Sequence, residues 1–145
     1  MTVISLITNL RSLIGDEDST NYRYSDNVLR DTKIPAGTKR FNLLNFQRFL
    51  ITGVSDAKVF DPTPVAEEAS RINLHTAISI LNGEIQKAAH NSVVVTNPAG
   101  RTDLTKVVGA LQTQRDNLKI ELKEYENGVT FGKIADDIDT DDEKF

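Results

Sequence analysis

The chain has 145 residues, a length that suits one domain with its own core. It contains no cysteine, which excludes disulfides and thiolate metal sites, and no tryptophan, which argues against a stacking platform for single-stranded nucleic acid. The net charge is −4, and no apolar run is long enough to predict a membrane-spanning helix. We expect no secretory leader, because no basic region precedes the first apolar stretch.

The negative charge is concentrated near the C-terminus. Residues 136–145 contain six acidic residues and one lysine, a net charge of −5, which leaves +1 for the other residues. Such an acidic segment is typically solvated and disordered, and it can also dock on a basic surface of a partner. We therefore predict a helical domain over residues 1–128 and an acidic flexible C-terminal tail over residues 129–145.

The first predicted helix spans residues 2–14, where apolar residues recur at helical spacing. Gly15 follows at the place of a left-handed C-terminal cap. Ser25 is a good N-cap for a second helix, and Asp26 suits its first turn. Pro35 lies only ten residues further on, so we expect this helix to stop or kink before it.

Two segments rich in strand-forming residues, 46–53 and 58–60, predict an antiparallel pair that turns between Gly53 and Asp56. The sequence Asp-Pro-Thr-Pro at residues 61–64 then breaks the chain before the next helix.

Apolar periodicity predicts a long helix over about residues 64–90. Residues 92–103 flank the turn-forming sequence Asn-Pro-Ala-Gly and predict a second β-hairpin. A last helix is expected over residues 104–127, with Gly128 as its stop. The predicted fold is thus mostly α, a small helical bundle with long antiparallel helices, one or two short β-hairpins and an acidic C-terminal tail.

Catalytic and metal-binding patterns are missing from the sequence. His75 and His90 are not spaced as metal ligands, and we expect structural roles for both, with His75 on the more polar side of its helix. Asp16, Glu17 and Asp18 could hold a divalent cation, but we interpret them as a solvated turn. We therefore predict a protein that is not an enzyme and has no cofactor or metal site.

Candidate interface residues fall into three groups. Tyr22 and Tyr24 either pack locally and fix their loop or join adjacent copies of the protein. Arg115 interrupts a heptad seam in the last helix, with its head either in water or facing an acidic group at a subunit boundary. Apolar residues of the predicted hairpin and tail, which we expect a partner to cover, complete the set: Val93, Val94, Val95, Val129, Phe131, Ile134, Ile138 and Phe145.

Two stretches of the chain resemble a known family. Leu10-Arg-Ser-Leu-Ile-Gly-Asp16, followed by Asn21-Tyr-Arg-Tyr-Ser-Asp26, is similar to the N-terminus of the head-tail connector (adaptor or neck) proteins of tailed bacteriophages. Residues 80–104, ILNGEIQKAAHNSVVVTNPAGRTDL, resemble that family's helix, β-hairpin and start of the following helix. Together the matches cover roughly residues 1–32 and 62–126. Pro35 departs from the longer helix of the family pattern.

The resemblance implies a structural virion protein of the phage neck, made in the host cytoplasm. It implies a homo-oligomeric ring, a dodecamer like the portal, that contacts the portal protein and the tail or stopper protein. DNA would pass through the lumen without sequence-specific binding, and no membrane is involved. The acidic tail would dock on a basic groove of the portal or of the adjacent copy.

Two alternatives stay open at this point. One is another virion protein, such as a tail-completion or stopper protein, although these tend to be richer in strand. The other is a non-viral helical adaptor module.

Overall fold

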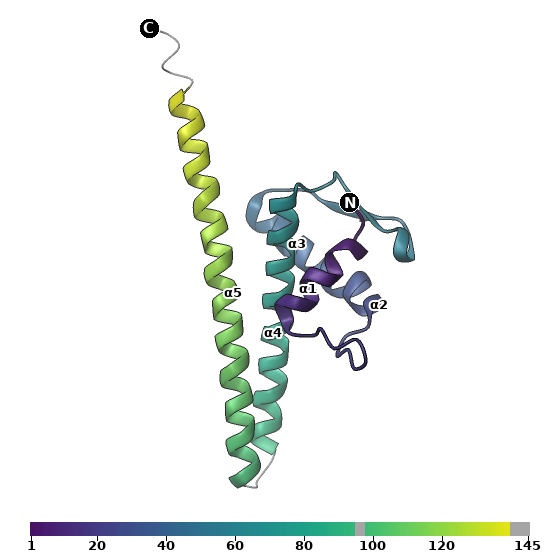
Figure 1. Ribbon diagram of the computed structural model, residues 1–145, viewed down its shortest axis with the longest axis vertical. Helices are drawn as coiled ribbons and strands as arrows, with labels where there is room; N and C mark the ends of the chain where they lie inside the picture. Colours follow the sequence, from purple (N-terminus) through teal and green to yellow (C-terminus); the bar gives the residue numbers. More distant parts are fainter. Residues whose placement is uncertain (95–97, 140–145) are drawn as a thin grey trace.

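The computed structural model describes the backbone of residues 1–94 and 98–139 and the side chains of residues 1–91 and 106–128. The chain is mostly helical with one two-stranded antiparallel sheet in the described part, which confirms the predicted fold class (Figure 1). The elements in chain order are η1 (Ile4–Leu6), α1 (Ile7–Ile14), α2 (Asp26–Val28), η2 (Leu29–Lys33), α3 (Ile34–Asn45), β1 (Leu50–Thr52), η3 (Ser55–Ala57), β2 (Val59–Asp61), α4 (Ala66–Val94) and α5 (Pro98–Asp139).

The core surrounds α4. From Arg71 to Ile78 every side chain of this helix is buried, because α1, α3 and α5 pack around it (Figure 1). Leu10 of α1 and Phe41 of α3 are among the largest fully buried side chains. In the described part of the chain, no helix is long and apolar enough to cross a membrane.

The first helix confirms the prediction from the sequence. It begins with the 3-10 turn η1 and ends at Gly15, whose φ of 64° is left-handed. The Gly15 N–H donates to Ser12 O at 3.2 Å, which satisfies one of the free carbonyls at the helix end.

The predicted stop before Pro35 is wrong, because the helix continues past this residue. Ser25 caps α2 as expected, its Oγ accepting from the Val28 N–H at 3.3 Å. The π-helical segment η2 then widens the turn, and Pro35 follows in the first turn of α3. Pro35 cannot donate to the preceding turn, and it directly follows the wider π-helical turn in which the Ile34 N–H donates to Leu29 O.

The predicted strand pair is confirmed. In it β1 and β2 are antiparallel, with Ile51 opposite Phe60, and Gly53 has a positive φ of 94° at the turn. The N-terminus joins this sheet edge, since the Val3 N–H donates to Lys58 O at 2.9 Å.

The β-hairpin predicted over residues 92–103 is wrong. Val93 and Val94 lie in the last turn of α4, and α5 begins at Pro98, so residues 92–94 and 98–103 are helical (Figure 1). A proline favours the first position of a helix as much as a β-turn, and a β-branched run lowers helix propensity only slightly. Val95 lies outside the described residues.

The predicted helix end at Gly128 is also wrong, because α5 continues to Asp139. One glycine in a helix interior costs about 1 kcal/mol relative to alanine, which is too little to end a long helix. The boundary between domain and tail at residue 129 therefore has no break in the backbone. The flexibility of the tail stays a prediction.

Candidate functional site

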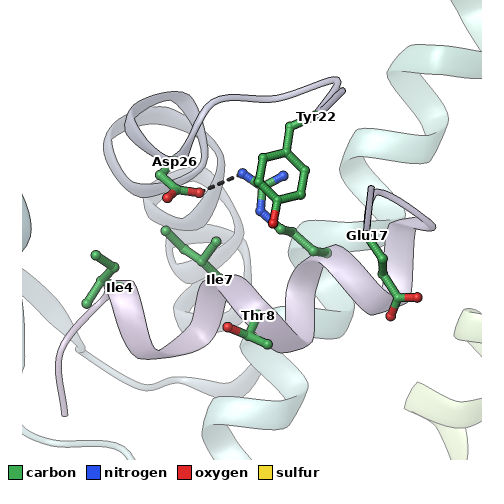
Figure 2. Close-up of a pocket in the computed structure, with 7 residues that line it drawn as sticks. Ile4, Ile7, Thr8, Glu17, Tyr22 and Asp26 are labelled. Carbon is green, nitrogen blue, oxygen red and sulfur yellow. Dashed lines mark hydrogen bonds and ion pairs between the residues drawn. The ribbon is translucent and has the colours of Figure 1, made fainter. Parts of the chain in front are cut away.

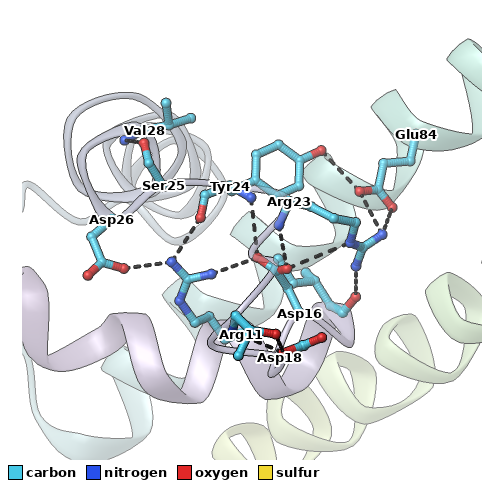
Figure 3. A network of polar contacts seen from close by, with 11 residues as sticks. Arg11, Asp16, Asp18, Arg23, Tyr24, Ser25, Asp26, Val28 and Glu84 are labelled. Carbon is cyan, nitrogen blue, oxygen red and sulfur yellow. Dashed lines mark hydrogen bonds and ion pairs between the residues drawn. The ribbon is translucent and has the colours of Figure 1, made fainter.

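Arg11 is the centre of a polar network that fixes the loop between α1 and α2 (Figure 3). Its side chain is buried, and its guanidinium donates to Asp16 Oδ2 at 2.6 Å, Tyr24 O at 2.8 Å and Asp26 Oδ1 at 2.6 Å. One buried cation thus joins the end of the first helix to the start of the second. A charge-assisted network of this kind holds its geometry tightly.

Asp16 is the buried anion of this network and corrects the expectation of a wholly solvated acidic turn. Its side chain is about as buried as that of Arg11. Besides the ion pair with Arg11, it accepts the backbone N–H of Arg23 at 2.8 Å and that of Tyr24 at 3.4 Å. Glu17 and Asp18 are exposed, and no cluster of three metal-ligating side chains occurs among the described residues.

Glu84 of α4 ties the same loop to the central helix. It accepts from Arg23 Nη1 at 3.0 Å and from the Tyr24 hydroxyl at 3.0 Å (Figure 3). Burial, followed by the negative charge of Glu84, raises the pKa of Tyr24 to about 12. These contacts support the local-packing interpretation of Tyr24.

Tyr22 lies on the open side of the loop. Its ring covers the Arg11 guanidinium at 3.5 Å, and its side chain is 41% exposed. The two residues line a hollow of about 330 Å³ with Ile7, Thr8 and Asp26 (Figure 2). The Arg11 charge is already balanced by two carboxylates.

Arg115 lies at the seam between α4 and α5. Its Nη1 donates to Asn82 Oδ1 at 3.4 Å, and its Nη2 pairs with Asp116 of its own helix at 2.8 Å. Leu118 and Leu122 of the predicted heptad seam are buried beside it, while Leu111 and Tyr125 pack partly against the core. The seam is confirmed, and the Arg115 head already has a partner within the chain.

The remaining predicted interface residues lie in α4, in α5 or outside the described part of the chain. Val93 and Val94 lie at the end of α4 that points away from the loop between α1 and α2 (Figure 1). The side chains of the α5 positions Val129, Phe131, Ile134 and Ile138 lie outside the described residues, as do Val95 and Phe145.

His75 is buried, although the sequence pattern placed it on the polar side of its helix. Its ring meets the Phe41 ring edge-on, with 6.0 Å between the centroids. Burial, with the nearby charges of Arg40 and Arg71, lowers its pKa to about 4. His75 is therefore a neutral core residue at pH 7.

A cluster of exposed apolar residues at the end of α3 was missed in the sequence. Leu43, Leu44, Phe46 and Leu50 are all largely exposed, and Phe46 is almost fully so. The signal was present, since residues 43–50 contain more apolar side chains than one helix face or one strand face can bury.

Comparison with known proteins does not place the chain in a family. No protein-family model, curated protein or solved structure matches it. Its function must be inferred from its own residues and fold.

Proposed function

We propose that this protein is a non-enzymatic structural subunit of the neck of a tailed bacteriophage. Copies of it would form a ring that joins the portal to the tail or to a stopper and lets DNA pass. Support comes from the sequence resemblance over residues 1–32, together with a helical fold in which that stretch becomes a fixed joint between helices.

The observation that carries this proposal is the exposure of α5. This helix has 42 residues, about 63 Å at 1.5 Å per residue. Within its described side chains, residues 106–128, only Leu118 and Leu122 are buried. Its C-terminal part extends beyond the rest of the molecule (Figure 1). Helices in proteins gain most of their stability from tertiary packing, so a long and little-covered helix favours assembly with partners.

Charge distribution agrees with passage of DNA through a ring. The chain outside residues 136–145 carries a net charge of only +1. Tight non-specific DNA binding requires many cationic contacts to phosphates, which such a surface offers sparsely. A nearly neutral lumen would let DNA slide with little adhesion.

Strand content separates the proposal from one alternative. In the described residues the strands β1 and β2 have three residues each, whereas stopper and tail-completion proteins are expected to be richer in strand. A non-viral helical adaptor remains the second candidate, and it would form no ring on a portal.

Electron micrographs of the purified full-length protein, alone and mixed with the portal protein encoded by the same genome, test the proposal. We expect closed rings, or a ring assembled on the portal if the free chain stays monomeric. A chain that forms no ring and does not bind the portal would contradict the proposal. So would substrate turnover that is lost when an acidic or histidine side chain is replaced.

A further inference from the structure

An apolar groove with a basic rim runs between α3 and β1. It consists of two adjoining hollows of about 510 and 290 Å³, and both are lined by Lys39, Asn42 and Leu50. Leu43, Gln47 and Arg48 complete the larger hollow. The side chains of Leu43 and Leu50 are 77% and 63% exposed, so the groove is open to a partner.

The groove is preformed by the turn that follows α3. Phe46 ends the helix in a left-handed conformation, φ 54°, which is unusual for a residue with a bulky side chain. The Asn42 side chain then binds both backbone groups of Phe49, accepting its N–H at 3.0 Å and donating to its carbonyl at 2.8 Å. These hydrogen bonds fix this side of the groove before any partner binds.

The rim of the groove carries unbalanced positive charge. Residues 32–55 contain four basic residues and no acidic residue. Lys39 and Arg48, which line the groove, are exposed, and neither takes part in an ion pair within the described part of the chain. By contrast, Arg30 and Lys58 near the sheet are both paired with acidic residues.

The same chain contains a segment of matching chemistry. Residues 136–145 carry a net charge of −5, and the segment 134–145 includes Ile134, Ile138 and Phe145. Ile134 and Ile138 are four positions apart, the spacing that places two residues on one side of a helix. Apolar anchors among acidic residues complement an apolar groove with a basic rim.

We propose that the groove between α3 and β1 binds the acidic segment, residues 134–145, of a second copy of this chain. This contact deepens the proposed function, because a head-to-tail interface between different surfaces is what closes a ring. The end of α5 extends beyond the body that holds the groove, which presents the segment to a neighbour (Figure 1).

Cysteine cross-linking tests the contact directly, since the natural chain contains no cysteine. Full-length Leu43→Cys and Ile138→Cys variants with different tags are mixed and oxidised, both alone and after assembly on the portal protein. We expect a disulfide-linked heterodimer. The matched control replaces Leu43→Cys by Ile120→Cys, which lies at an exposed apolar position of α5 outside the groove and should give only background linkage. No heterodimer above this control would overturn the proposal.

The double variant Leu43→Cys/Ile138→Cys shows whether the segment bound in the groove comes from a neighbouring copy or from the same chain. A ladder of linked oligomers is expected. Linked monomers alone would mean that the segment folds back onto its own groove, and this result would overturn the proposal of a second copy.

Charge reversal tests the rim. Lys39→Glu/Arg48→Glu and Asp141→Lys/Asp142→Lys should each reduce cross-linking about 5-fold against their unchanged partner. Mixing the two reversed variants should restore it, and failure of this rescue in variants with unchanged circular dichroism would contradict the proposal. A neck ring seen in micrographs without this cross-link would refute only the groove contact. The cross-link without any ring would refute only the proposed function.

Discussion

Gly37 of α3 and Thr76 of α4 lie so close that a Cβ on Gly37 would overlap Thr76 Oγ1. The backbone Cα of Thr76 would also lie only 2.9 Å from this Cβ, so a rotamer change could not relieve the overlap. The approach of α3 to the central helix thus depends on a residue without a side chain.

Gly37→Ala should therefore destabilise the protein by about 1–3 kcal/mol, the usual cost of overpacking, despite the better helix propensity of alanine. Gly83→Ala is the matched control in α4, because nothing lies within 4 Å of a Cβ at that position. It should stabilise the fold by up to about 1 kcal/mol. Chemical denaturation of the two variants measures both changes, and equal effects would contradict the close helix contact.

Asp16→Asn should destabilise the protein by about 3 kcal/mol, because it leaves the buried Arg11 cation with only the exposed Asp26 as an ionic partner. The matched control is Asp18→Asn in the same loop, where the side chain is exposed and the change should be within about 0.5 kcal/mol. Thermal unfolding of the two variants provides the comparison. Similar melting temperatures would show that the Arg11 network does not hold the loop.

Tyr24→Phe should cost about 1 kcal/mol through loss of the hydrogen bond to Glu84. The pKa of Tyr24, raised to about 12, also predicts a pH effect. The folded state holds this proton more tightly than the unfolded state, so its contribution is present below pH 10 and is lost as the pH rises from about 10 to about 12. The ionisation of the tyrosines can be followed by their ultraviolet absorbance, because the chain contains no tryptophan that would contribute to the signal. The component that titrates at the highest pH should be absent in Tyr24→Phe.

His75 predicts a loss of stability in mild acid. Its pKa is lowered to about 4 in the folded state, so the unfolded state binds the proton first. Stability should fall as the pH drops below about 6.5, by about 2 kcal/mol at pH 5, and the effect should level off below pH 4. His75→Leu should remove this component, whereas His90→Leu, at an exposed position, should retain it. Denaturation curves at pH 7.5 and pH 5 measure the difference.

Deletion of residues 129–145 should leave folding nearly unchanged, because the described core of α5 ends at Leu122 and Tyr125. Docking on the portal or on a second copy should weaken, and raised salt should mimic part of that loss through screening. Sedimentation of the truncated and full-length proteins with and without salt checks this. Unchanged assembly would leave the segment as a solubilising end.

Local chemistry in the sequence was enough to predict several elements. The left-handed Gly15, the Ser25 cap and the turn at Gly53 depend on contacts within a few residues. The heptad pattern around Leu118 also located the α5 face that packs on α4, because one helix period determines which side chains share a face.

Only the tertiary structure decided the features that depend on distant residues. Asp16 and His75 look like surface groups in sequence, yet both are buried by packing against other parts of the chain. The chain remains helical past Pro35 and Gly128 and forms no β-hairpin over residues 92–94 and 98–103. A glycine in a helix interior costs only about 1 kcal/mol, and Pro35 directly follows the wider π-helical turn of η2, so neither local signal ends its helix.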